Sequence, residues 1–411
     1  MSRLTRIDLA SLSPTERRRI TRRSAVPDPE VRLRAAEICR AVRDGGDAEM
    51  AAIAARVGGG FRRITDSELE SAVASLDPGV RNALEAAIAA VEEFHRSQLP
   101  AEVQVTTAPG VEITRAWAPL RRVGAYVPGG KAAYPSTAVM TVVPARVAGV
   151  AEIVVASPEA PDGTVPEVML AACRLAGATE VWAMGGAQAI AALAYGTESV
   201  EPVDKIVGPG NAWVTAAKLE VFGTCAIDLP AGPSEVLVLA DSTSDPALVA
   251  VDLLCQAEHG PDSPAVLVTT DPDLVEEVEA EIERLLPGLE RADILSKALS
   301  DHGLAVVAPD RETALAFANE YASEHVTILT ADPEADAAEI VAAGSVYVGA
   351  WAPESAGDYA TGANHVLPTG GLAVACGPLS TTDFGSWRQV QRLTREGLEA
   401  ISPTITELAT A

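Results

Sequence analysis

Basic residues are scarce in this chain of 411 residues. Lysine and arginine together number 31, against 57 aspartates and glutamates, which gives a formal net charge of −26. Only four of the basic residues are lysines, and the basic residues do not gather into a patch. Because binding to nucleic-acid phosphates requires a basic face, the composition argues against a nucleic-acid partner. The acid excess fits either a salty cytosol or an ordinary solvated surface.

Long apolar runs and paired cysteines are missing as well. No stretch is apolar for long enough to cross a membrane, and the first residues contain no apolar run of a signal peptide. The five cysteines are scattered and form no CxxC pair, which is typical of free thiols in a reducing compartment. The sequence therefore predicts a cytoplasmic protein without a membrane partner.

Hydrophobic residues are plentiful, at 48% of the chain, although aromatic residues make up only 4%. From about residue 123, short runs rich in Val and Ile alternate with Ala-rich helical stretches. Continuous apolar runs separated by helices indicate parallel strands that are buried on both faces, so we predict an α/β fold with two such units. The runs are RVGAYVP, EIVVASP, EVWAMGG, KIVGPG, CAIDLP, EVLVLAD, AVLVTTD, LAVVAPD, VTILTAD and SVYVGAW.

The two ends of the chain have a helical pattern. Apolar residues recur at three- and four-residue spacing over much of residues 1–100, and the stretch from residue 383 onward also has a helical pattern. A stretch rich in proline and glycine, DLPAGPS at 228–234, marks the expected break between the two α/β units.

One candidate metal site lies at the end of a predicted helix over 247–259. Asp245 is a suitable N-cap and Pro246 a suitable first residue for this helix. Gln256 and His259 are three residues apart and share a face, and a histidine with an oxygen donor suits zinc. A histidine in a last helical turn is also favoured by the helix dipole alone, so the spacing leaves both interpretations open.

Two further segments carry polar groups inside an apolar sequence. Glu324 and His325 are adjacent before a predicted strand, where a histidine and a carboxylate could relay protons, or could be a surface pair. The segment 354–371 shows no clear periodicity and reads as a long irregular loop, which is often functional but can be merely solvated. Its polar residues include Glu354, Asp358, Asn364 and His365, of which Asp358 is a plausible metal ligand.

Glycine-rich turns follow three of the predicted strands. They are YVPGGKAAYPST, MGGAQAIAAL and VGPGNAWVTAAK, and the last two open a helix. Such turns present backbone N–H groups to a phosphate, although any strand-to-helix turn favours glycine. None matches GxGxxG or GxxxxGK[ST]. Three turns in one half of the chain nevertheless predict a nucleotide site there.

The candidate residues do not fit one edge of one parallel sheet, where ligands usually bind beyond the carboxyl ends of the strands. Gln256 and His259 come at a helix end, Glu324 and His325 precede a strand, and Asp358 follows one. Either a strand runs antiparallel, or the site lies between two units or subunits.

Taken together, these segments resemble the histidinol dehydrogenase family over nearly the whole chain. The motifs that carry the resemblance are YVPGG, GGAQAIAALAYGTESV, VDKIVGPGN, AIDLPAGPSEVLVLAD, QAEHGPDS, ASEH and APESAGDYATGANHVLPTGG. The resemblance implies oxidation of L-histidinol through L-histidinal to L-histidine, with two NAD⁺ and one zinc ion per subunit. These reactions are the last two steps of histidine biosynthesis.

The resemblance also implies roles for individual residues. Zinc ligands are expected at Gln256, His259 and Asp358. His325 is the expected general base, and Glu324 is expected to help activate water in the second oxidation. The remaining positions implied by the family are NAD contacts at Tyr126, Gln188 and Asn211 and substrate contacts at Ser234, Gln256, His259, His325 and Asp358.

The resemblance further implies a homodimer and two incomplete Rossmann-like units. The expected divisions are an N-terminal segment at 1–22, a first α/β domain at 23–124 and 235–376, a second at 125–234 and a C-terminal segment at 377–411. In the family, a fourth zinc ligand and a substrate-contacting Glu belong to a C-terminal segment that reaches the partner subunit, and no residue of this sequence matches them.

Two alternatives stay open because of that difference. One is a related zinc- and NAD-dependent alcohol dehydrogenase that acts on another amino alcohol or a diol. The other is a homologue that binds NAD or metal without turnover.

Overall fold

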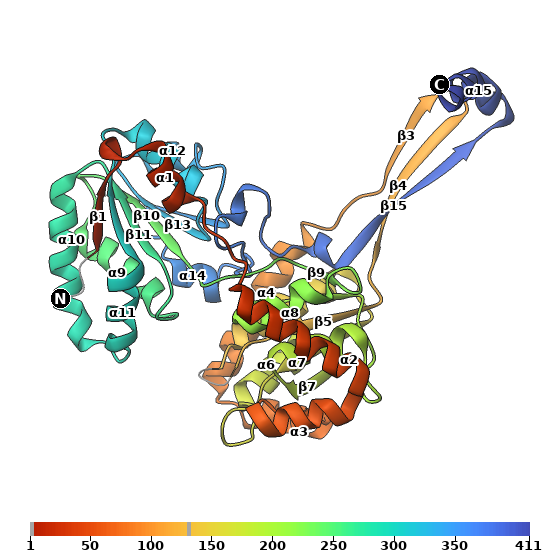
Figure 1. Cartoon of the computed structure of the whole chain (residues 1–411), viewed down its shortest axis with the longest axis horizontal. Helices are drawn as coiled ribbons and strands as arrows, with labels where there is room; N and C mark the ends of the chain where they lie inside the picture. Colours follow the sequence, from red (N-terminus) through yellow and green to blue (C-terminus); the bar gives the residue numbers. More distant parts are fainter. Residues whose placement is uncertain (1–3, 130–132) are drawn as a thin grey trace.

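The computed structural model describes residues 4–129 and 133–411, and its strands form two large sheets and a small one (Figure 1). Sheet A is six-stranded and all of its pairs are parallel. In spatial order it contains β1 (Thr5–Asp8), β12 (Gly303–Val307), β11 (Ala265–Thr269), β10 (Val236–Ala240), β13 (His325–Leu329) and β14 (Ser345–Val348).

Sheet B is also six-stranded, and only its edge strand β2 runs antiparallel. Its strands are, in spatial order, β2 (Phe61–Arg63), β7 (Glu180–Met184), β6 (Glu152–Ser157), β5 (Arg122–Tyr126), β8 (Lys205–Val207) and β9 (Ala226–Ile227). The ten strands expected from apolar runs are β5 to β14, which confirms the predicted α/β class. The chain passes from sheet B to sheet A between β9 and β10, within the stretch DLPAGPSE.

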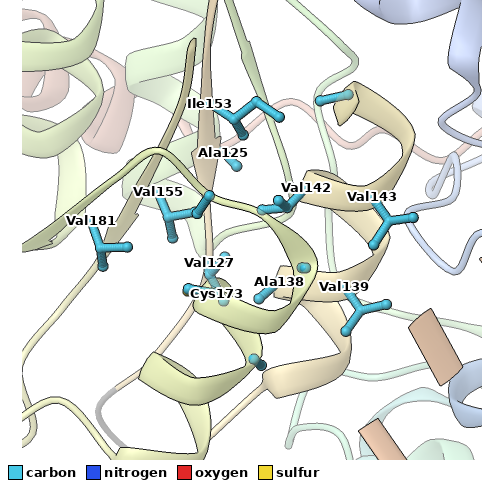
Figure 2. Close-up of a cluster of buried hydrophobic side chains, with 14 of the residues drawn as sticks. Ala125, Val127, Ala138, Val139, Val142, Val143, Ile153, Val155, Cys173 and Val181 are labelled. Carbon is cyan, nitrogen blue, oxygen red and sulfur yellow. The ribbon is translucent and has the colours of Figure 1, made fainter. Parts of the chain in front are cut away.

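Helices cover both faces of sheet B, because successive residues of each strand point to opposite sides. Val155 and Val181 belong to one buried cluster, part of which is drawn in Figure 2, whereas Val154 and Trp182 belong to the other. The first cluster includes residues of α3 (Asp66–Ser75), α4 (Pro78–Arg96), α5 (Pro135–Ala148) and α6 (Glu167–Ala176). The second includes residues of α2 (Pro29–Val57), α7 (Gly186–Tyr195) and α8 (Ala212–Val221).

Sheet A is covered in the same way. One face packs against α9 (Pro246–Ala257), α10 (Pro272–Leu285) and α11 (Ala292–His302), and the other against α1 (Pro14–Thr21) and α12 (Arg311–Tyr321). The remaining short helices are α13 (Pro333–Ala337), α14 (Glu354–Tyr359) and the 3₁₀ turns η1 (Leu9–Ser11), η2 (Leu286–Gly288), η3 (Leu372–Val374) and η4 (Thr381–Phe384). No helix of the described residues is both long and apolar enough to span a membrane.

The third sheet forms an arm that projects from the two α/β units (Figure 1). It consists of β3 (Val103–Ala108), β4 (Val111–Pro119) and β15 (Gly385–Leu393), all antiparallel, and α15 (Arg395–Thr410) lies at its tip. The expectation that the chain is helical from residue 383 is therefore wrong for β15. Most of this strand is exposed and it has no buried face, so no apolar alternation revealed it.

Sheet membership also differs from the expected grouping of the N-terminal residues. The segment 1–22 contributes β1, which pairs with β12 at the edge of sheet A. Most of the segment 23–124, which was expected to join residues 235–376, instead packs with sheet B through α2, α3, α4 and β2. Amphipathic helices reveal which face is buried but not which sheet buries it, so the sequence could not assign them.

Candidate active site

A cavity of about 540 Å³ lies between the two α/β units. From sheet B it is lined by residues that follow strands: Pro128 after β5 and Gly210–Ala212 after β8. From sheet A it is lined by residues that precede strands or begin them: Ser234 before β10, and Glu324 and His325 at the start of β13. The carboxyl edge of sheet B thus faces the amino edge of sheet A.

This arrangement explains why the candidate residues did not fit one sheet edge. Every strand of sheet A is parallel, so the alternative with an antiparallel strand is wrong, and the site lies between two units. Helix α9 begins after the carboxyl end of β10 and returns toward the amino edge, where Gln256 and His259 lie. Helix α14, with Asp358, also lies at this edge, because Glu354 on the same helix approaches His325.

Three potential metal ligands converge at the cavity, where His259 and Asp358 belong to its lining and Glu354 is buried behind it. His259, Glu354 and Asp358 each offer a ligand atom, and these atoms all lie within 4.8 Å of one another. The spacing of four residues on α14 places both carboxylates on one face. His259 lies two residues beyond the end of α9, so it is not on the helix as expected; its ring Nδ1 lies 3.3 Å from the Cys255 carbonyl oxygen.

Glu354 was not among the expected site residues, although it belongs to the segment that was singled out. The prediction of an irregular loop over 354–371 was wrong at its start, because α14 covers Glu354–Tyr359. A helix of six residues is too short to show a period in the sequence. The spacing of four residues between the two acids was the only available signal.

Buried polar atoms without a hydrogen-bond partner mark the same place. They include both amide atoms of Gln256, both carboxylate oxygens of Glu354 and both ring nitrogens of His325. Such groups are rare, since burying an unpaired polar atom costs free energy. Nitrogen and oxygen donors of this kind suit zinc, so the residues present fit a metal ion.

His325 is buried and electrically neutral. Burial lowers its pKa to about 3, with a further lowering from nearby His259 and His365. Its Nδ1 lies 3.8 Å from Glu324 Oε2 and 3.8 Å from Glu354 Oε1, which is beyond hydrogen-bonding distance. The neutral ring therefore has two carboxyl groups near Nδ1 without binding either of them.

Glu324 is held by two donors. Its Oε2 accepts hydrogen bonds from Ser234 Oγ at 2.5 Å and from the Glu235 N–H at 3.0 Å. Burial raises the pKa of Glu324 to about 8, despite the opposing effect of these donors. A carboxyl group with a pKa near the working pH can both accept and release a proton.

The expected NAD contacts lie at the carboxyl edge of sheet B. Asn211 lines the cavity and caps α8, its Oδ1 accepting hydrogen bonds from the Trp213 and Val214 N–H groups. Tyr126 and Gln188 are buried and outside the cavity lining, as is Gln256. The Tyr126 hydroxyl accepts from the Gly186 N–H at 3.2 Å, at the start of α7. Gly130 of the first glycine turn lies outside the described residues.

Other cavity residues were not predicted as site residues. His365 lines the cavity with a buried Nε2 that has no partner, and burial lowers its pKa. The neighbouring Asn364 explains how this loop is held, since its Nδ2 donates to the Met140 carbonyl oxygen at 2.8 Å. The cavity wall also includes residues 24–27, which come from a linker with no sequence signal of its own.

The family model, two similar proteins and one solved structure all indicate the same family. The family model described as histidinol dehydrogenase matches residues 21–411. The histidinol dehydrogenase of Methanothermobacter thermautotrophicus is 47% identical over 378 residues, which span 91% of this chain and 88% of that protein. The histidinol dehydrogenase of Halobacterium salinarum is 47% identical over 407 residues, which span 98% of this chain and 95% of that protein. The crystal structure of the enzyme from Elizabethkingia anophelis superposes with a TM-score of 0.92 at 34% identity, covering 99% of this chain and 94% of that one.

Proposed function

Because the chain belongs to the histidinol dehydrogenase family of NAD-dependent oxidoreductases, we propose that it oxidises L-histidinol through L-histidinal to L-histidine. One observation carries this proposal. A buried, neutral imidazole and a cluster of side chains that could hold a metal ion face the glycine turns of a second α/β unit across one cavity. This juxtaposition suits the removal of a proton from an alcohol together with the transfer of a hydride.

The zinc ligands in this proposal are Gln256, His259 and Asp358, and Glu354 is added because its carboxylate joins the cluster. Zinc bound there would hold the substrate through its imidazole and amino nitrogens and so fix the reactive carbon in place. Ser234 lines the same cavity, and its hydroxyl is positioned by the bond to Glu324, which supports its assignment as a substrate contact.

His325 acts as the general base that takes the proton of the substrate hydroxyl. The ring is neutral, so its free nitrogens can accept a proton, and the carboxyl groups of Glu324 and Glu354 each lie 3.8 Å from Nδ1. His325 is the first residue of β13, a central strand of sheet A, so the backbone holds it rigidly.

Glu324 serves the second oxidation. A carboxylate at this position can take a proton from the water that attacks the aldehyde, and its raised pKa makes that transfer favourable near neutral pH. Cys255 is a poor alternative nucleophile. Burial raises the pKa of its thiol to about 12, which keeps it protonated.

The nicotinamide cofactor belongs to the carboxyl edge of sheet B. The starts of α7 and α8 lie there, and the positive ends of their helix dipoles fit the phosphates of a dinucleotide. Tyr126, Gln188 and Asn211 are the proposed contacts. NAD⁺ bound at this edge would accept the hydride from the substrate.

A homodimer is part of the proposal. The arm exposes apolar side chains that neither α/β unit covers, which supports a contact with a second copy. The exposed residues are Val103, Val105, Val390, Leu393, Leu398, Ile405 and Leu408. Light scattering should give twice the chain mass of 42.5 kDa, and a single chain mass would refute the dimer.

The deciding experiment is NAD⁺ reduction by the zinc-loaded chain with L-histidinol. We expect two NADH for each L-histidine formed, because each oxidation transfers one hydride. Turnover with another amino alcohol or a diol, but not with L-histidinol, would replace the proposed substrate. Binding of NAD⁺ and zinc without any product would instead indicate a homologue that has lost catalysis.

A further inference from the structure

Lys218 is a buried lysine on α8 whose ammonium group makes three contacts. It forms an ion pair with the Asp228 carboxylate and donates to the Gly208 carbonyl oxygen at 2.9 Å and the Leu229 carbonyl oxygen at 3.0 Å. The side chains of Lys218 and Asp228 are each only 2% exposed. All three N–H donors of the ammonium group are therefore accounted for.

The Lys218–Asp228 pair binds both backbone polar groups of Gly208, which belongs to the glycine turn after β8. Lys218 binds the Gly208 carbonyl oxygen, and Asp228 Oδ2 accepts from the Gly208 N–H at 2.7 Å. Gly208 has a φ of +107°, and a Cβ there would lie 2.2 Å from the Tyr126 carbonyl oxygen. The turn thus packs closely against Tyr126, one proposed NAD contact. Three residues after Gly208 it reaches Asn211, another proposed contact.

The same lysine also holds the start of the segment that joins the two units. Leu229, which accepts its third bond, begins the stretch that runs through the cavity-lining residues 231–234 to β10. Buried ion pairs are seldom needed for stability, since a protein in which apolar residues of similar volume replace the pair is often equally stable. The position of this pair, beneath the cavity wall, points to a role in the geometry of the site.

We propose that the Lys218–Asp228 pair is a positioning device that sets the affinity for NAD⁺, by fixing the turn 208–211 against Tyr126. This inference rests on the proposed NAD⁺ site at the carboxyl edge of sheet B. Neither side chain lines the cavity, so both act through the backbone they hold.

A purely structural pair would lower stability without a selective effect on NAD⁺ binding, and the chain offers a matched control. Arg122 is 4% exposed at its side chain and pairs with Glu180 at 2.8 Å, at the amino edge of the same sheet. Breaking that pair disturbs the same unit at the edge opposite the proposed site.

The test measures the dissociation constant for NAD⁺ by calorimetry on zinc-loaded protein, beside the melting temperature and the zinc content. The variants are Lys218→Met, the double variant Lys218→Met with Asp228→Asn, and Arg122→Met. The double variant leaves no uncompensated buried charge, so it should recover part of the melting temperature lost in the single variant. It still lacks the donor to Gly208 and Leu229, so its NAD⁺ affinity should stay about ten-fold weaker than that of the parent.

Arg122→Met should melt at a lower temperature while its NAD⁺ affinity stays within about two-fold of the parent. A folded double variant with unchanged affinity would overturn the inference, and so would an equal loss in Arg122→Met. Asn211→Ala and Tyr126→Phe separate this failure from failure of the NAD⁺ site. If both leave the affinity unchanged, the site assignment is wrong and the inference falls with it; if they weaken binding and the double variant does not, only the inference fails.

Discussion

The two sheet edges that face each other across the cavity differ in how their polar groups are satisfied. At the carboxyl edge of sheet B, Tyr126, Asn211 and Lys218 all have hydrogen-bond partners within the protein. At the amino edge of sheet A, Gln256, His325 and Glu354 carry buried atoms with none. Unpaired buried groups cost stability, and an edge that keeps them is prepared for a ligand.

The two edges therefore have different tasks. Sheet B presents backbone turns that are already held in place, as a preformed receptor for a cofactor requires. Sheet A presents three side chains, of Gln256, His325 and Glu354, with buried polar atoms that gain partners only when something binds, as a reactive centre requires. Substitutions at sheet A should therefore abolish chemistry or metal binding, and those at sheet B should weaken NAD⁺ binding.

The largest effect is expected at His325. His325→Asn removes the proposed base but keeps a small polar side chain, so turnover of L-histidinol should fall by about 10³-fold. Zinc content should not change, because His325 is outside the proposed ligand set. The measurement is steady-state NADH formation beside metal analysis. His302→Asn, an exposed histidine at the end of α11, is the matched control and should keep full turnover. Activity in His325→Asn near that of the control would remove His325 as the base.

The second-largest effect is expected on zinc binding, when proposed ligands are substituted. His259→Ala should lose bound zinc. Glu354→Gln should weaken zinc binding by at least about ten-fold, because the Glu354 carboxylate either binds the ion or positions another ligand. Zinc per chain after dialysis against a buffered zinc solution gives the answer.

The matched control for Glu354→Gln is Glu258→Gln, the same chemical change beside His259 at a side chain that is 54% exposed. It should retain zinc. Normal zinc binding in Glu354→Gln would return the ligand set to Gln256, His259 and Asp358.

A third prediction concerns the stability cost of sheet A's polar groups. Burial raises the pKa of Asp252, on α9, to about 6. Asp252 thus binds a proton more tightly in the folded protein than in the unfolded chain, so stability falls as pH rises from about 4 to about 6.

Asp252→Asn cannot ionise and should remove this loss. We expect it to be more stable than the parent above pH 6 by on the order of 2–3 kcal/mol, and to show no such gain near pH 4. Denaturant unfolding of metal-free protein at several pH values measures the difference. An equal gain at every pH would show that the effect is not ionisation.

Much of this fold could be predicted, because the inner strands of both large sheets are buried on both faces and their sequences are continuously apolar, whereas the exposed edge strands β1 and β2 were not predicted. β15 could not be, since an exposed strand carries no such pattern. The residues of the site were harder to predict from the sequence. Residues such as His325 and Asp358 stand out by chemistry and family resemblance, but Glu354 became visible only when α14 placed it one turn from Asp358. Nothing local in the sequence shows that the amino edge of one sheet meets the carboxyl edge of another, because that depends on how the two units pack.

The smallest effect is expected at the carboxyl edge of sheet B, where the polar side chains already have hydrogen-bond partners. Asn211→Ala removes the cap of α8, which should cost about 1 kcal/mol of stability, and it removes a side chain from the cavity wall. NAD⁺ binding should weaken several-fold, while zinc binding stays normal. Asp271→Ala removes the equivalent cap of α10, on sheet A and outside the cavity lining, so it should cost similar stability and leave NAD⁺ affinity unchanged. If both variants weakened NAD⁺ binding equally, the loss would come from general destabilisation, and the division of tasks between the two edges would be wrong.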